Sequence, residues 1–188
     1  MKKVILGLVL AAGLAGAASA APVYPVAVVE TNTNGTILSP ERADPLAMFD
    51  GDTTTFYSLG LGGYAILDFG PGGVKSPGSV TEVTFRLAGY IEKLRVLISN
   101  SLDPASFVSV ATVENDEAQA PSGAVLSFVA PAFRYVKLLD FSPVRADRDG
   151  FDVAEISFSP VPLPAAGFLL GGALFGLGAL RRRRAKKA

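Results

Sequence analysis

The sequence predicts an all-β fold for residues 21–159, built as an antiparallel two-sheet sandwich or jelly roll. Short runs of β-branched and aromatic residues recur along this segment, and clusters of Gly, Pro, Asp and Ser separate them. Helical periodicity is nearly absent. About eight short strands at such spacing are typical of two packed antiparallel sheets. The segment is long enough for one domain with a hydrophobic core.

Alternation of apolar and polar residues is clearest at two expected strands, 83–87 (VTFRL) and 93–98 (KLRVLI). Residues two apart in a strand share a face, so Leu94, Val96 and Ile98 should point inward together. The other expected strands are 23–30, 64–69, 107–113, 124–129, 133–139 and 151–158. A single helical turn is expected at 44–48, and loops are expected at 71–78, 101–105, 114–123 and 142–150.

The N-terminal segment 1–20 has the three parts of a secretory signal. Two lysines follow Met1, an apolar run continues to about Ala17, and Ala18-Ser19-Ala20 supplies the small residues that signal peptidase accepts at Ala18 and Ala20. The sequence therefore predicts export and cleavage after Ala20. An uncleaved N-terminal anchor is the alternative, although the apolar run is short for a membrane span.

The C-terminal segment 160–188 predicts a membrane helix followed by a basic cluster. Residues 165–180 carry no charged or polar side chain, and as a helix they would span roughly 24 Å, against about 30 Å for a bilayer core. The cluster at 181–187, in which Arg181, Arg182, Arg183 and Arg184 are consecutive, should remain cytoplasmic and stop the helix. The central domain would then face outward.

Charge is unevenly distributed along the chain. The chain has 17 basic and 17 acidic residues, but two basic residues lie in the predicted signal and six in the tail. Nine basic residues remain in 21–160 with all 17 acidic ones, a net charge of about −8. An acidic domain argues against nucleic-acid binding. Because the chain has no His and no Cys, disulfides and the common His-dependent nucleophile systems are excluded.

One acidic loop is a candidate metal site. Asp50-Gly51-Asp52 is followed by Thr55, and calcium takes six to eight oxygens from carboxylates, carbonyls and hydroxyls. The alternative is a polar turn in which the Asp side chains accept hydrogen bonds from backbone N–H groups. Two further acidic segments, 147–152 and 114–117, are predicted to be solvated turns.

The tail resembles a known sorting signal. Its order of motif, apolar helix and arginine cluster is similar to the PEP-CTERM family in its VPLPA variant, and the motif consists of Val161, Pro162, Leu163, Pro164 and Ala165. The resemblance implies recognition by an exosortase-type membrane peptidase in a Gram-negative bacterium. The protein would be inner-membrane-anchored in transit, with its domain periplasmic, and would then reach the cell surface or extracellular matrix.

The central domain resembles the discoidin-like, galactose-binding-like (factor V/VIII type C) jelly rolls, which include many carbohydrate-binding modules. The matching stretches are 47–58 (AMFDGDTTTFYS), 64–70 (YAILDFG), 134–138 (RYVKL) and 150–156 (GFDVAEI). Tyr57 stands where the family has Trp. The resemblance implies a structural Ca²⁺ held by Asp50, Asp52 and Thr55 and closed by Glu155.

Three functions follow from these features. The first is a non-enzymatic structural or adhesive protein of the cell surface or matrix. The second is a carbohydrate-binding module that attaches to exopolysaccharide. The third is a small secreted hydrolase that uses paired carboxylates, the catalytic pair that a chain without His and Cys still allows.

Overall fold

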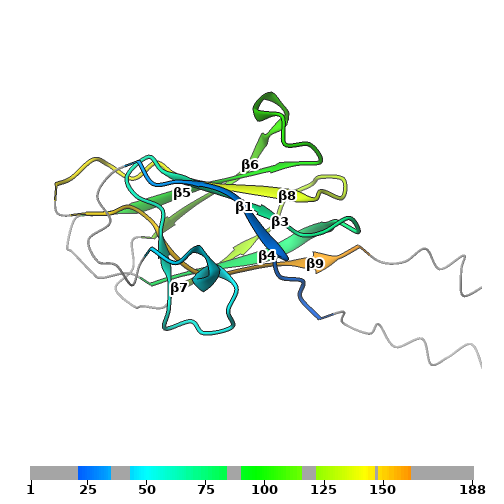
Figure 1. Ribbon diagram of the computed structural model, residues 1–188, viewed down its shortest axis with the longest axis horizontal. Helices are drawn as coiled ribbons and strands as arrows, with labels where there is room; N and C mark the ends of the chain where they lie inside the picture. The colour runs from blue at the N-terminus through cyan, green and yellow to red at the C-terminus, as the bar shows by residue number, and fades with distance from the viewer. Residues whose placement is uncertain (1–20, 35–42, 84–89, 116–121, 147, 162–188) are drawn as a thin grey trace, which may run out of the picture.

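Two antiparallel sheets packed face to face make up the domain (Figure 1). The computed structural model describes residues 21–34, 43–83, 90–115, 122–146 and 148–161. The five-stranded sheet has the order β1 (Ala27–Asn32), β3 (Tyr64–Asp68), β8 (Tyr135–Asp140), β5 (Glu92–Ser99) and β6 (Val108–Asn115). The four-stranded sheet has the order β2 (Tyr57–Ser58), β9 (Asp152–Pro160), β4 (Val74–Glu82) and β7 (Ser122–Leu126). Two 3-10 turns, η2 (Pro45–Met48) and η3 (Pro104–Ser106), complete the described elements.

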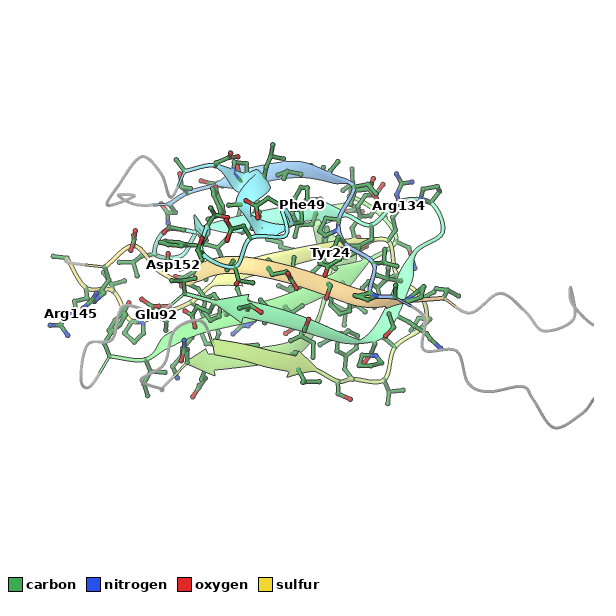
Figure 2. All side chains as sticks on the ribbon, turned by 90° about the horizontal axis from the view of Figure 1, so that it is seen from below. Tyr24, Phe49, Glu92, Arg134, Arg145 and Asp152 are labelled. Carbon is green, nitrogen blue, oxygen red and sulfur yellow. The ribbon has the colours of Figure 1, made fainter. Side chains whose placement is uncertain are left out.

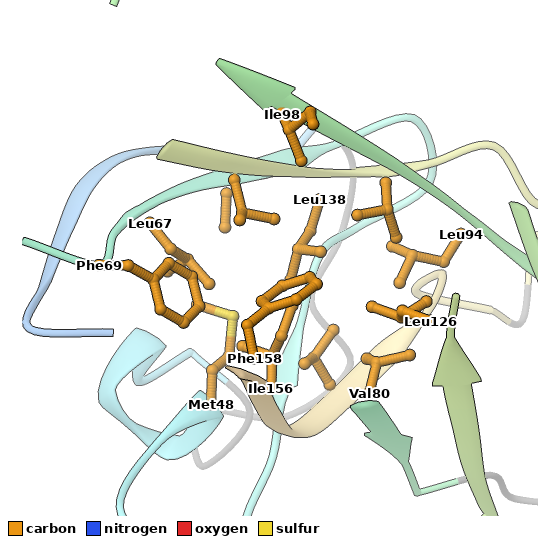
Figure 3. Packing of buried hydrophobic residues seen from close by; sticks show 14 of the residues in the cluster. Met48, Leu67, Phe69, Val80, Leu94, Ile98, Leu126, Leu138, Ile156 and Phe158 are labelled. Atoms are coloured by element: carbon orange, nitrogen blue, oxygen red, sulfur yellow. The ribbon is translucent and has the colours of Figure 1, made fainter. Parts of the chain in front are cut away.

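The predicted all-β sandwich is confirmed. Neighbouring strands in both sheets pair antiparallel, and the turn expected at 44–48 is η2. Alternation places Leu94, Val96 and Ile98 of β5 in the core, as predicted. The core lies between the sheets, where Phe158 packs against the rings of Phe69 and Phe133 at centroid distances of 5.5 and 5.1 Å (Figure 3). Burial of each such side chain stabilises the fold by about 1.5–3 kcal/mol.

The loop predicted at 71–78 is confirmed as a turn at 71–73 and is wrong from Val74 on, because β4 begins there and continues to Glu82. The composition of Lys75-Ser76-Pro77-Gly78 is that of a turn, yet a register shift between Lys75 and Gly78 accommodates these residues as an irregularity in the pairing with β9. Gly78 is required here, since a Cβ at this position would lie 2.2 Å from the Phe158 ring. Of the strand expected at 83–87, only Val83 lies among the described residues, and it follows β4 outside any strand.

Other strand limits differ by a few residues. The strand expected at 23–30 is an isolated bridge at Val23 and then β1, whereas the loop expected at 114–123 contains the start of β7. The two-residue strand β2 was not predicted, because two residues are too few to show alternation.

The first and last described segments run side by side. Val23 N–H donates to Phe158 O (2.8 Å), and Phe158 N–H donates to Val23 O (2.9 Å). Both ends of the domain therefore leave from one pole of the sandwich. The predicted signal (1–20) and the tail beyond Val161 lie outside the described residues, as do Ala18, Ala20, the arginine cluster and the motif from Pro162 onward. Within the described ranges, no helix has the length and apolar character needed to cross a membrane.

Candidate functional site

Several strands meet at the pole opposite the chain ends, and each contributes a polar side chain. β4 ends at Glu82, β5 begins at Glu92, β6 ends at Asn115, β8 ends at Asp140 and β9 begins at Asp152. We call this end, with the 142–150 loop above it, the loop pole. Figure 2 shows Glu92, Asp152 and Arg145 at this end and Arg134 at the other.

Asp140 organises the backbone of the loop pole. Its buried carboxylate accepts hydrogen bonds from the N–H groups of Gly62 (2.8 Å) and Phe151 (3.0 Å) and from the Ser142 hydroxyl (2.6 Å). Ser142 Oγ in turn accepts a hydrogen bond from Lys93 N–H (2.9 Å). One carboxylate thus ties three separate segments together, and charge-assisted bonds of this kind are stronger than neutral ones.

Gly150 allows the 142–150 loop to approach its neighbour closely. Its φ is +82°, in the left-handed region, and a Cβ would lie 2.8 Å from the carbonyl of Gly60 and 3.0 Å from the Asp140 carboxyl carbon. A side chain at this position would separate the two loops. The backbone around Asp140 therefore depends on this glycine.

A pair of carboxyl groups is buried beneath the loop. Glu82 is 1 % exposed and Glu92 is 7 % exposed, and the two side chains lie close enough to interact. Burial and the neighbouring Glu92 raise the pKa of Glu82 to about 10, and burial raises the pKa of Glu92. Asn115 Nδ2 donates to Glu82 Oε2. The pair can hold one proton between them at neutral pH.

Two arginines flank an aromatic ring at the surface of the loop pole. Arg145 and Arg148 lie with their guanidinium carbons 6.0 and 5.6 Å from the centre of the half-buried Tyr90 ring. The Tyr90 hydroxyl donates to the Pro143 carbonyl (3.0 Å). Burial, with the charges of Glu92 and Asp140, raises the pKa of Tyr90 to about 12. Tyr90 is therefore a neutral ring with two cations close to it.

Comparison with solved structures relates this architecture to known modules. The C-terminal domain of a chitobiase from Bacteroides fragilis has a TM-score of 0.55 at 15% identity, covering 77% of this chain and 100% of that one. CBM62 from Clostridium thermocellum Xyl5A has a TM-score of 0.51 at 21% identity, covering 77% and 99%. CBM32 of AlyQ has a TM-score of 0.50 at 20% identity, covering 73% and 97%.

The chain has a galactose-binding-like jelly-roll fold. The predicted fold class is thereby confirmed. No protein-family model matches the sequence, and no curated protein matches it.

The three loop residues predicted to bind calcium lie together on the jelly roll and are exposed. Asp50 Oδ1 accepts a hydrogen bond from Asp52 N–H (2.8 Å), and Asp50 Oδ2 accepts one from the Thr55 hydroxyl (2.7 Å). Asp52 Oδ1 accepts from Thr54 N–H (2.8 Å) and from its hydroxyl (2.7 Å), and the Thr54 hydroxyl lowers the pKa of Asp52. Such hydrogen bonds are those expected for a polar turn, which was the alternative to a calcium site.

Glu155, the fourth residue predicted to bind calcium, belongs to a different element. It is in β9 opposite Thr81 of β4, on the sheet face turned away from its buried neighbour Ile156. Among the described residues, no three or more acidic side chains form a group that could hold a metal ion, so Asp50, Asp52 and Glu155 do not form one. The side chains alone do not fit a calcium site, and the predicted calcium stays a prediction.

One of the two acidic segments predicted to be solvated turns, 147–152, is partly buried instead. Asp149 and Asp152 are each 3 % exposed, and the Ser58 hydroxyl contacts both carboxylates. The prediction failed for this segment because acidic composition normally indicates solvent exposure, whereas here distant strands bury these side chains. In the other segment, 114–117, the Glu114 side chain is exposed, and residues 116–117 lie outside the described residues.

Sequence reasoning missed the residues of the loop pole, although one signal was present. Glu92 continues the inward-facing series of Leu94, Val96 and Ile98, and Asp140 continues that of Val136 and Leu138. An acidic residue in phase with a buried face predicts a buried carboxylate. For Tyr90, Arg145 and Arg148 we find no comparable local signal.

Proposed function

We propose that this protein is a carbohydrate-binding module that holds a glycan at the loop pole. The observation that carries the proposal is the placement of Arg145 and Arg148 around Tyr90. An aromatic ring can pack against the apolar face of a sugar, and a guanidinium group donates several hydrogen bonds to hydroxyl or carboxylate oxygens. Loops carried on a rigid β-sandwich commonly present binding residues in this way.

The structural neighbours support a glycan ligand. CBM32 of AlyQ was solved in complex with 4,5-unsaturated mannuronic acid. A pectin-binding carbohydrate-binding module has a TM-score of 0.50 at 22% identity, covering 73% of this chain and 95% of that one. These two structural neighbours favour glycan binding over the purely structural role, which was the first of the three functions expected from the sequence.

Binding is proposed without hydrolysis. A glycosidase needs two carboxyl groups that flank the scissile bond of a bound sugar. At the loop pole, the paired carboxyl groups of Glu82 and Glu92 lie inside the sandwich, where a polysaccharide does not reach them.

The test is binding of the full chain, kept in mild detergent, to alginate, pectin and a neutral galactan. Tyr90→Ala is expected to weaken binding about tenfold, equivalent to about 1.4 kcal/mol. Tyr24→Ala, which removes a partly exposed ring near the opposite pole, is the matched control and should bind like the wild type. An equal loss of affinity in both variants would show that the glycan does not bind at Tyr90. If none of the three polysaccharides binds saturably, the structural surface role becomes the better proposal.

Export and sorting form the second half of the proposal. Residues 1–20 would be removed by signal peptidase, and the tail from Val161 would hold the domain at the inner membrane until an exosortase-type peptidase acts. The N- and C-terminal segments leave the sandwich at one pole. The loop pole would therefore point away from the membrane, toward exopolysaccharide.

A further inference from the structure

The buried carboxyl pair joins the two sheets. Glu82 is the last residue of β4 in the four-stranded sheet, and Glu92 is the first residue of β5 in the five-stranded sheet. Asn115, the last residue of β6, donates to Glu82 from the same side as Glu92. This contact therefore holds the ends of three strands together, and the charge of Glu92 acts on Tyr90.

Two oxygen atoms of the pair have no hydrogen-bond partner. Glu82 Oε1 and Glu92 Oε2 are both fully buried and accept no hydrogen bond from the residues described. Two adjacent carboxylates that each keep one unpartnered oxygen are unfavourable in a low-dielectric interior, because each charge loses its hydration and repels the other. One proton shared between them removes one charge and supplies the missing donor.

The other charged groups around the pair do not replace that proton. From the described elements, Asp152 of β9 faces Glu82, while Asp140 of β8 and Asp149 face Glu92, and all three add negative charge. Arg148 is the cation that faces Glu92. It also lies over the Tyr90 ring, so one guanidinium connects the pair to the proposed glycan site.

We propose that Glu82 and Glu92 share a single proton and so form a pH-sensitive latch that closes the loop pole and holds Arg148 against Tyr90. The regulatory part of this proposal rests on the proposed glycan site, whereas the latch itself does not. When the proton leaves, both carboxylates are charged, the ends of β4 and β5 repel, and Glu92 attracts Arg148 away from the ring.

The direction of the pH effect follows from the raised pKa of Glu82. An unfolded Glu loses its proton near pH 4.3, whereas the folded pair retains one up to about pH 10. The folded state therefore binds more protons than the unfolded state between these values. The free energy of unfolding must then fall as pH rises through this window. The latch is closed at acidic and neutral pH and opens in the alkaline range.

The test compares the wild type with Glu82→Gln at pH 6 and pH 9.5. A Gln amide can accept from Asn115 and donate to Glu92, which reproduces the shared proton permanently. We expect the melting temperature of the wild type to fall between the two pH values and that of Glu82→Gln to fall by less than half as much. Glu114→Gln, at an exposed carboxylate, is the control and should fall like the wild type. Equal falls in all three proteins would overturn the latch.

A second measurement does not depend on the variant. Carbon NMR of the Glu carboxyl groups in the wild type should show one group that does not titrate between pH 3 and pH 7. If every Glu carboxyl group titrates normally in that range, the shared proton is refuted even where Glu82→Gln fails to fold.

A measurement of glycan binding at two pH values distinguishes the latch from the proposed glycan site. With alginate or pectin as the probe, wild-type affinity should fall at least threefold from pH 6 to pH 10.5, where most of the pairs have lost the proton, and Glu82→Gln should retain its affinity. Binding that is independent of pH in the wild type would overturn the regulatory role while leaving the glycan site intact. If no polysaccharide binds but the stability difference is observed, the latch stands and the proposed function fails.

Discussion

Single carboxylates at the loop pole behave differently because their partners differ. Asp140 accepts hydrogen bonds from two backbone N–H groups and a hydroxyl. Glu82 is as deeply buried but has Asn115 as a donor and Glu92 as a neighbour, and burial together with Glu92 raises its pKa. The two buried acids therefore differ in the number of donors around them.

Replacement of Asp140 by Ala should be among the more damaging changes at this pole. It would leave the N–H group of Phe151 buried without an acceptor, a loss that costs about 1–3 kcal/mol, and would also remove the acceptor of the Gly62 N–H and the Ser142 hydroxyl. We expect the free energy of unfolding to fall by about 3 kcal/mol, as measured by urea denaturation.

Asp103→Ala is the matched control for that change. Asp103 is exposed, and its carboxylate accepts one hydrogen bond, from Ala105 N–H (3.0 Å), at the start of η3. Its loss should cost about 1 kcal/mol. Equal losses in the two variants would show that Asp140 does not organise the loops.

Among the elements, β4 shows how a strand can carry a sequence typical of a turn. Pro77 and Gly78 lie at an irregular point of the pairing with β9, and the missing Cβ of Gly78 makes room for the Phe158 ring. Local propensity at these residues favours a turn, but packing of the core aromatic against the strand outweighs it.

The loop at 50–55 is the element on which the calcium proposal depends. Asp50, Asp52 and Thr55 lie together, and calcium also accepts backbone carbonyl oxygens, which a loop of this kind can supply. If calcium is bound, excess chelator should lower the melting temperature of the wild type by several degrees, through linkage of binding to folding. Asp50→Ala should melt lower than the wild type and respond little to chelator. A wild-type melting curve that is unchanged by excess chelator would contradict calcium binding.

At the scale of the whole molecule, the two chain ends and the loop pole lie at opposite ends of the sandwich. A domain held by its tail would thus present Tyr90 and the arginines outward. The net charge of about −8 on residues 21–160 favours solubility of such a domain.

Processing of the chain has a direct readout in the intact mass of the protein recovered from cells. We expect residues 1–20 to be missing, together with the segment beyond about Pro164. Replacement of Pro162 and Pro164 by Ala should leave the tail attached, because the extended, accessible segment before the helix is lost. A mass that includes the whole tail in the wild type would contradict cleavage and favour a permanent anchor.

Alternation along the chain was sufficient to predict the sandwich and several of its strands, because a residue's face in a strand depends only on its position. The strand limits at β4 and β7 were not predictable in this way. At β4 a distant aromatic ring explains the glycine, and at β7 pairing with β4 brings a polar, loop-like stretch into the sheet.

The sequence alone determined the fold class, the acidic character of the domain and the unusual composition of both ends, since each follows from composition or short-range order. Tertiary structure alone decided that Glu82 and Glu92, from different sheets, share one buried contact, and that Arg145 and Arg148 lie around Tyr90. The physical reason is that the pKa of a carboxyl group and the geometry of a binding surface depend on which groups are brought opposite one another, and such long-range contacts leave no local pattern.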